Sequence, residues 1–383
     1  MGKVVVIAGE VSGDMHAARV IREIKRLAPA TEISGMGSSC LQQEGVNVII
    51  DPTQINVIGF LEALKNIKVH LSHLRTMEEH IEKEKPDVLF LVDYSGFNMF
   101  MARMAKKKGI PAVSFFPPSA WVWGRWRAKW MSRTGVKIAA AFPRERNVYL
   151  EAGASVEFVG HPLLDMVEVT EDNTTIYKKL EVDPKKPVIG LLPGSRNSEI
   201  ESLLPEMLQA AEKIQKEREE AQFILPLAEG IDKSEIIKEL SKYNLVIKVV
   251  KNYTYPVMKT ADFLITASGT ATLEAAILKT PMIIIYKTSN FSYQLGKRLL
   301  KVDNIGMPNI IANNKVVPEL LQQQVTAEKI YEEALNFLNR PYLISGMVKK
   351  LERIKDMLGE EGATTRTAEL VLKEGDLDYG AEK

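Results

Sequence analysis

Short runs of valine, isoleucine and leucine alternate along this chain with longer amphipathic segments, and no other feature constrains the fold as much. Strands that are apolar on both faces lie inside a parallel sheet, and the amphipathic segments between them become its covering helices. The runs form one series at residues 4–8, 31–35, 47–50, 87–93, 111–116 and 137–141, and a second at 188–192, 222–226, 245–249, 262–265 and 282–286. The sequence therefore predicts two α/β halves, each built on a parallel sheet.

The length supports this division, because 383 residues fit two domains of about 150–200 residues each. Residues 160–187 are polar and rich in proline and charge, so we interpret them as the linker. We expect a first domain over residues 1–165, a second over 166–345, and a C-terminal helix with a charged tail over 346–383.

Composition excludes several classes of function. Fifty basic against 49 acidic residues give a net charge of +1, which argues against nucleic acid as a partner. Cys40 is the only cysteine, and no carboxylate or cysteine cluster accompanies the five histidines, so we expect neither a metal site nor a cofactor. The most apolar long stretch, residues 261–286, carries charges that a spanning helix would exclude, and the first strand begins too early for a signal peptide. We expect a cytoplasmic protein.

Two strand-turn-helix segments place a glycine and a hydroxyl where a helix begins. The first reads Gly9-Glu10-Val11-Ser12-Gly13-Asp14 and the second Pro193-Gly194-Ser195-Arg196. The first backbone N–H groups of a helix are unpaired and lie at the positive end of its dipole, so such turns suit a phosphate. The first segment lacks the common dinucleotide and ATP fingerprints, and Ser12 or Asp14 could instead cap the helix. Two such turns half a chain apart suggest two nucleotide-fold halves that face a cleft.

A third segment, Thr266 to Glu274, follows an apolar run and opens another helix. Ser268, Gly269 and Thr270 can offer N–H and hydroxyl donors to a diphosphate, and Glu274 can accept from two ribose hydroxyls. Arg196 adds a planar fork that matches phosphate. The alternative is an ordinary helix start followed by a solvated glutamate. We favour a nucleotide-bearing donor in the second half.

All four tryptophans fall within residues 121–130, interleaved with arginine and lysine. Mixed aromatic and basic residues suit the lipid headgroup zone, or a lipid-bearing phosphorylated substrate. Two further patches combine apolar and basic residues, at 57–70 and 291–301. Each could be a half-buried helix face, but three patches in a nearly neutral chain favour contact with a membrane surface.

Five or more motifs in order resemble those of the lipid-A-disaccharide synthase family, and the resemblance covers nearly the whole chain. The motifs are Ala8-Gly9-Glu10-x-Ser12-Gly13-Asp14, Ser119-Ala120-Trp121-Val122-Trp123, Phe158-Val159-Gly160-His161-Pro162, Leu191-Leu192-Pro193-Gly194-Ser195-Arg196-x-x-Glu199-Ile200, Ala267-Ser268-Gly269-Thr270-Ala271-x-Leu273-Glu274, Pro308-Asn309 and Pro318-Glu319-Leu320-Leu321-Gln322.

The resemblance implies an inverting glycosyltransferase of the B type, with two Rossmann-like domains and an interdomain cleft. It implies transfer of 2,3-diacylglucosamine from UDP to the 6-hydroxyl of 2,3-diacylglucosamine 1-phosphate, which gives a β-1,6 disaccharide and UDP without a metal. It also implies an enzyme peripheral to the inner face of the cytoplasmic membrane, and a homodimer that exchanges C-terminal parts, so that Arg196, Glu274 and Asn309 complete a cleft on the partner chain.

One position departs from the family pattern as we interpret it. That pattern places a suspected general base three residues after the aspartate at position 93, where this chain has Gly96. The attacking hydroxyl still needs a proton acceptor, so we assign that role to Asp93, with Ser12 orienting the acceptor sugar. Two alternatives stay open: another UDP-sugar enzyme, such as a peptidoglycan lipid glycosyltransferase or a UDP-N-acetylglucosamine 2-epimerase, and a non-catalytic acyl-sugar or nucleotide binder.

Overall fold

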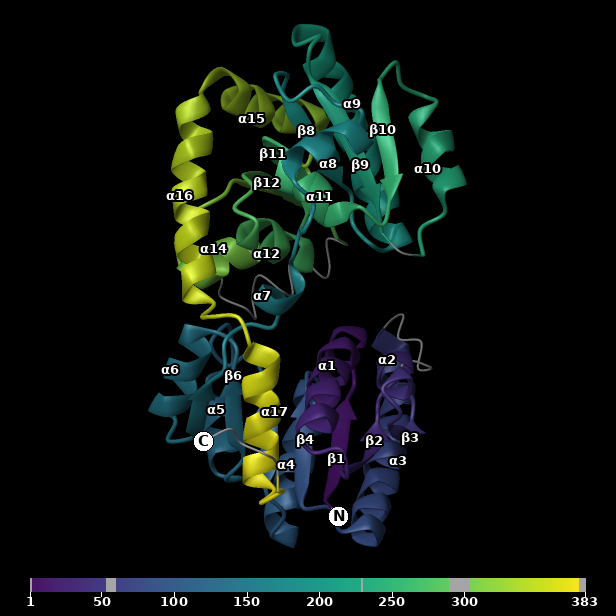
Figure 1. Cartoon of the computed structure of the whole chain (residues 1–383). Helices are drawn as coiled ribbons and strands as arrows, with labels where there is room; N and C mark the ends of the chain where they lie inside the picture. The colour runs from purple at the N-terminus through teal and green to yellow at the C-terminus, as the bar shows by residue number, and fades with distance from the viewer. Residues whose placement is uncertain (1, 53–59, 229, 289–303, 379–383) are drawn as a thin grey trace. The chain divides into compact units, whose positions relative to one another are not determined.

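The structure is a computed structural model that describes residues 2–52, 60–228, 230–288 and 304–378 (Figure 1). Contacts divide the chain into two compact units, Met1–Asp165 with Leu358–Lys383, and Met166–Met357. The expected ranges ended the second domain at residue 345 and set 346–383 apart. In the structure the chain instead divides near residue 357, because the helix before this point packs in the second unit and the helix after it packs in the first.

A parallel sheet of seven strands forms the centre of the first unit. Its strands pair in the order β3-β2-β1-β4-β5-β6-β7, so the order reverses between β1 and β4. Such a reversal is the switch point at which α/β sheets bind ligands, beyond the carboxyl ends of the strands. The strands are β1 Lys3–Ala8, β2 Glu32–Met36, β3 Asn47–Ile50, β4 Val88–Val92, β5 Ala112–Phe115, β6 Lys137–Ala140 and β7 Ser155–Phe158.

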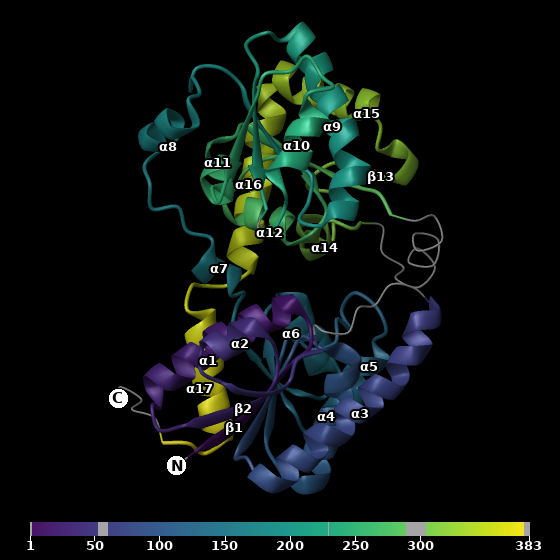
Figure 2. The ribbon, with the colours of Figure 1, turned by 90° about the vertical axis from the view of Figure 1, so that its right-hand side faces the viewer.

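Helices cover both faces of this sheet. Figure 2 shows α1 and α17 on one face, and α3 and α4 on the other. The helices are α1 Val11–Leu27, α2 Ser39–Gln43, α3 Phe60–Glu84, α4 Ser95–Lys108, α5 Trp126–Ser132, α6 Pro143–Glu151, α7 Leu163–Met166 and α17 Ala363–Glu374. The Asp165 carboxylate accepts from the backbone N–H groups of Gly362, at 2.5 Å, and Thr364, at 3.1 Å, which fixes the start of α17 in this unit.

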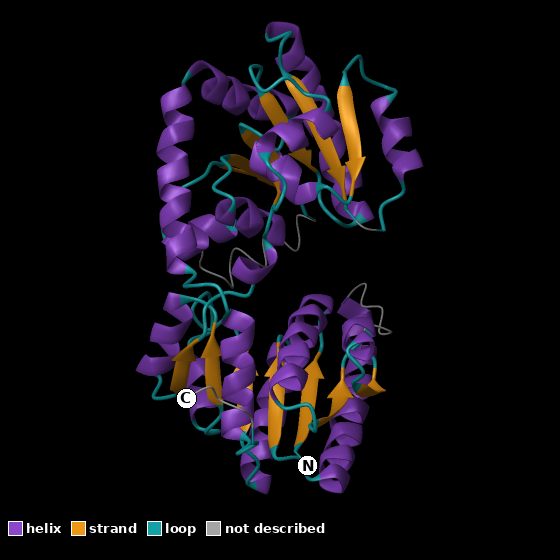
Figure 3. Ribbon diagram, viewed as in Figure 1, coloured by secondary structure: helices purple, strands orange, loops and turns teal. Residues whose placement is uncertain are grey.

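The second unit repeats the architecture around six parallel strands (Figure 3). Their order is β10-β9-β8-β11-β12-β13, with the switch point between β8 and β11. The strands are β8 Val188–Leu192, β9 Gln222–Leu227, β10 Ile247–Lys251, β11 Phe263–Ala267, β12 Met282–Tyr286 and β13 Glu319–Leu321. The predicted fold class, two parallel-sheet α/β domains, is confirmed.

The helices of the second unit also pack in two groups, α9 with α15, and α12 with α11, α14 and α16. They are α8 Asn173–Leu180, α9 Asn197–Glu217, α10 Lys233–Leu240, α11 Thr254–Thr260, α12 Thr270–Ile277, α14 Met307–Ala312, α15 Ala327–Asn339 and α16 Pro341–Met357. Across the described parts of the chain, none of the helices has the length and apolar character needed to span a membrane.

Candidate active site

The switch point of the first sheet brings together the two residues predicted to be catalytic. Ala8 at the end of β1 pairs with Val92 at the end of β4, so Gly9 and Asp93 leave the sheet side by side. The Ser12 hydroxyl, on the first turn of α1, donates to Asp93 Oδ2 at 2.9 Å. Ser12 and Asp93 lie 81 positions apart in the sequence, and the sheet topology brings them together.

The surroundings of Asp93 favour a carboxyl that can take up a proton. Burial raises the pKa of the Asp93 carboxyl, and the hydrogen bond from Ser12 opposes that rise. Its backbone lies in the left-handed region, with φ of 39°, which is uncommon for a residue other than glycine. A Cβ at Gly13 would come within 3.0 Å of Asp93 Cβ, so glycine allows α1 to approach this side chain closely.

Sequence reasoning did not single out Tyr94, which packs against the first turn. A Cβ at Gly9 would lie only 2.0 Å from the Tyr94 ring. The ring stacks on Phe97, and its hydroxyl lies 2.9 Å from His70 Nδ1 on α3. Burial, together with the nearby Glu10 carboxylate, raises the pKa of Tyr94 to about 12, so the phenol stays neutral. Tyr94 thus fixes the shape of the turn that carries Ser12.

Neither Ser12 nor Asp14 caps α1, so the capping alternative is wrong. The N-cap residue is Glu10, which makes no side-chain cap bond. The buried Asp14 carboxylate instead accepts from the backbone N–H and hydroxyl of Ser38, both at 2.7 Å, and from Cys40 N–H at 2.9 Å. Asp14 therefore holds the start of α2, and Ser12 remains directed at Asp93.

In the second unit, the Gly194 turn and the Ser268 turn follow neighbouring strands, because Leu192 of β8 pairs with Thr266 of β11. The expectation of unpaired N–H groups at the first of these turns is wrong. Glu199 Oε2 accepts from Ser195 N–H at 3.0 Å and from Arg196 N–H at 3.3 Å. A glutamate three residues into a helix reaches back to its start in this way. Its other oxygen holds the exposed Arg196 guanidinium at 2.9 Å.

The Ser268 turn is more open. Gly269 is the N-cap of α12 and makes no side-chain cap bond, and a Cβ there would meet nothing within 4 Å. Ser268 N–H bonds Ile285 in the sheet at 3.1 Å, while Gly269 and Thr270 are exposed. A helix start of this kind can accept an anion.

Glu274 is not a solvated glutamate. Burial raises the pKa of its carboxyl, and the Tyr255 hydroxyl on α11 donates to it at 3.3 Å. No sequence signal connects Tyr255 to Glu274, because the two residues lie on separate helices 19 positions apart. Hydrogen bonds from hydroxyl groups stabilise a carboxylate that is removed from water, so Glu274 is suited to bind the hydroxyls of a ribose.

Asn309, predicted to bind substrate, is fully buried, and its amide is occupied within the unit. Its Nδ2 donates to Val317 O at 2.9 Å and to Glu319 Oε1 at 2.6 Å, and its Oδ1 accepts from the N–H groups of Val316 and Val317. These bonds use the full capacity of the side chain. Asn309 therefore joins α14 to β13 in this structure.

The tryptophan-rich stretch divides into a buried and an exposed part. Trp121 is 9% exposed, whereas Trp123 and Trp126 are 41% and 60% exposed. Phe100 on α4, which contacts α5, is a further exposed apolar side chain at 59%. The side chains of the patch at 57–67 and all of the patch at 291–301 lie outside the described residues.

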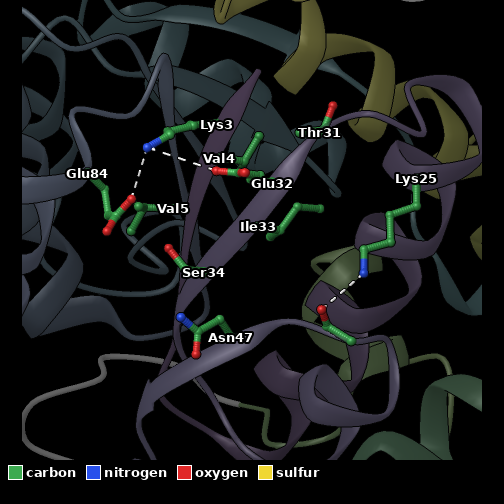
Figure 4. Close-up of a pocket in the computed structure, with 11 residues that line it drawn as sticks. Lys3, Val4, Val5, Lys25, Thr31, Glu32, Ile33, Ser34, Asn47 and Glu84 are labelled. Atoms are coloured by element: carbon green, nitrogen blue, oxygen red, sulfur yellow. Dashed lines mark hydrogen bonds and ion pairs between the residues drawn. The ribbon is translucent and has the colours of Figure 1, made fainter. Parts of the chain in front are cut away.

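A pocket of about 330 Å³ lies elsewhere, at the amino ends of β1 and β2 (Figure 4). Its lysines are already engaged: Lys3 pairs with Glu84 at 3.0 Å, and Lys25 donates to the carbonyls of Glu44 and Gly45. It lies at the edge opposite the switch point, so we do not assign the site to it. The described residues also contain no cluster of side chains that could hold a metal ion.

Nucleotide-sugar enzymes share this fold. A putative UDP-N-acetylglucosamine 2-epimerase of Listeria monocytogenes matches with a TM-score of 0.63 at 12% identity, over 98% of this chain and 96% of its own. A MurG of Acinetobacter baumannii matches with a TM-score of 0.60 at 14% identity, over 97% of this chain and 100% of its own. With the two doubly wound units, these likenesses assign the fold to the class of B-type glycosyltransferases.

Sequence similarity identifies the family within that class. A model of the family described as lipid-A-disaccharide synthetase matches residues 4–367. The lipid-A-disaccharide synthase of Geobacter sulfurreducens is 38% identical over 371 residues, which make up 97% of this chain and 97% of that protein. The chain belongs to the lipid-A-disaccharide synthase family, and it is a glycosyltransferase that forms the lipid A disaccharide.

Proposed function

We propose that the enzyme transfers 2,3-diacylglucosamine from UDP to the 6-hydroxyl of 2,3-diacylglucosamine 1-phosphate, with Asp93 as the general base. The observation that carries this proposal is the bond from the Ser12 hydroxyl to Asp93 Oδ2 at the first switch point. Asp93 is partly desolvated, so its carboxylate accepts a proton more readily than one in water does. Gly96 carries no acidic group, and Asp93 is therefore the carboxylate assigned to the reaction.

In this mechanism Ser12 orients the acceptor and Asp93 removes the proton from its 6-hydroxyl. The hydroxyl oxygen then attacks the anomeric carbon of the donor from the face opposite UDP, which inverts that centre. UDP leaves with both electrons of the broken bond. The charge that develops on its diphosphate is stabilised by the α12 start at Gly269 and Thr270 and by the Arg196 guanidinium, while Glu274 binds the ribose.

Two further features belong to the proposal. The exposed Trp126, with Arg125 and Lys129, forms a surface suited to lipid headgroups on the inner face of the cytoplasmic membrane. We also propose a homodimer, as the family resemblance implies. Sedimentation with anionic vesicles tests membrane binding: Trp126→Ser should weaken it, whereas Tyr342→Ser, at a similarly exposed aromatic of the second unit, should not. Light scattering tests the homodimer by measuring the mass of the particle in solution.

The decisive experiment incubates the protein with radiolabelled UDP-2,3-diacylglucosamine and the acyl-sugar phosphate, and separates the products. Formation of the disaccharide phosphate with release of UDP supports the proposal, and Asp93→Asn should slow it by about 100-fold or more. Binding of both substrates without product would instead indicate a non-catalytic binder. Conversion of UDP-N-acetylglucosamine to its 2-epimer would indicate the epimerase alternative, which has the same fold.

A further inference from the structure

The segment after β5, residues 116–125, begins beside Asp93 and carries two of the four tryptophans; we call it the tryptophan loop. Val92 pairs with Phe115, and Asp93 N–H donates to Phe115 O at 3.3 Å, so the loop leaves the sheet next to Asp93. Phe116, its first residue, has a φ of 50°, a strained conformation for a bulky side chain. Strain of this kind persists only where the surroundings hold the backbone in place.

Three buried polar side chains hold the loop, and all of them come from α5 and α6. The Tyr149 hydroxyl donates to Pro118 O at 2.8 Å. Arg127 Nη2 donates to Trp123 O at 2.8 Å, and its guanidinium lies 3.7 Å from the centre of the Trp123 ring. The Trp121 ring packs on Phe142, the N-cap residue of α6, with 5.1 Å between the ring centres, and its side chain faces the Glu145 carboxyl and lowers the pKa of that group.

Glu145 is the member of this set that approaches the reacting groups. Glu145 is 2% exposed, its carboxyl accepts from Ala141 N–H at 2.9 Å, and the negative charge of Asp93 contributes to raising its pKa. Burial raises the pKa of Glu145 to about 8, above the range of an ordinary glutamate. A carboxylate can cap the start of a helix while it remains at the surface in contact with water. Because Glu145 is instead buried next to the Trp121 indole, we infer that it has a role besides capping α6.

We propose that Glu145 is a positioning residue for the transfer reaction: it fixes the Trp121 indole, and with it the tryptophan loop, as the wall that holds the acceptor sugar beside Asp93. This inference rests on the proposed function. The half-exposed Trp123 offers that wall a flat apolar surface, and the Arg127 guanidinium on its ring limits its rotation. A sugar held against such a surface presents its hydroxyl to Asp93 in one orientation.

The test is a double-mutant cycle of Glu145→Gln and Trp121→Phe. Glutamine can still accept from Ala141 but places an amide donor where the carboxyl accepted from the indole, and phenylalanine removes the indole N–H. Each variant should raise the KM for the acceptor, or lower kcat, by about tenfold, with the KM for the donor unchanged within about twofold. The double variant should lose no more than either single one. Glu79→Gln, an exposed position on α3 whose side chain pairs with Arg75 of the same helix, serves as the control and should keep full activity.

Additive losses in the double variant would overturn the inference, as would losses that follow the melting temperature or fall equally on donor and acceptor. The double-mutant cycle requires that the wild-type enzyme first be shown to form the disaccharide. If the wild type makes no disaccharide, the proposed function fails; if it does and the two losses are additive, only the role of Glu145 fails.

Discussion

Replacing Gly9 by alanine should damage catalysis more than it damages the fold. The new Cβ would lie 2.0–2.4 Å from three carbons of the Tyr94 ring, whereas ordinary carbon contacts are about 3.5 Å or longer. One of the two groups must therefore move by more than about 1 Å. Tyr94 resists because it stacks on Phe97 at 5.0 Å between ring centres and bonds His70. We expect the turn that carries Ser12 to move instead.

The expected cost follows from that displacement. Overpacking of this size costs about 1–3 kcal/mol of unfolding free energy. Displacing Ser12 by about 1 Å relative to Asp93 should lower kcat about 100-fold. Denaturant unfolding and the disaccharide assay measure the two quantities separately. Gly346→Ala is the matched control: in α16 the new methyl meets nothing within 4 Å, so it should stabilise the protein by roughly 0.5–1 kcal/mol without changing kcat. A Gly9→Ala enzyme with wild-type kcat would refute the role given to this turn.

Three further substitutions test the site. Asp93→Asn should lower kcat by about 10²–10⁴-fold, and the acid limb of the wild-type pH profile should lie above the range of an ordinary aspartate, because burial raises that pKa. Arg196→Ala should weaken UDP binding by about 10–100-fold in calorimetry, while Arg218→Ala at the other end of α9 should not; equal affinities would count against a phosphate contact. Glu274→Gln should lose nucleotide affinity but melt at a higher temperature at pH 7. The folded pKa of Glu274 is raised, so its ionised form destabilises the fold above that pKa, and the advantage of glutamine should disappear as the pH falls through it.

Most strands that the sequence identified are buried on both faces, and the partly exposed edge strands β3 and β10 were found because they too contain runs of valine and isoleucine. β7 was missed because it is an edge strand in which exposed and half-buried residues alternate. β13, only three residues long, is too short to show a pattern. The expected linker contains α8, although Asp172 gave a capping signal there: its side chain accepts from Thr175 N–H at 3.0 Å.

The residues of the candidate site likewise divide into those that had a signal in the sequence and those that had none. Ser12 and Asp93 could be predicted to meet, because residues that follow adjacent parallel strands leave the sheet together. Glu199 also had a signal, since an acidic residue three positions after a helix start is the pattern of a capping box. The pairs Glu145 with Trp121 and Tyr255 with Glu274 had none, because each joins two elements whose packing the chain does not encode locally.

The two turns of the second unit differ in how readily each can bind the diphosphate. At the Gly194 turn, the Glu199 carboxylate already accepts from the N–H groups of Ser195 and Arg196, and it also holds the Arg196 guanidinium. A phosphate and this carboxylate cannot occupy the same donors, because both are anions. At Gly269 the helix start is exposed and has no side-chain cap, so a phosphate can bind there without displacing a carboxylate. We therefore expect α12 to receive the diphosphate first, and Arg196 to reach it only after exchanging Glu199 for the nucleotide.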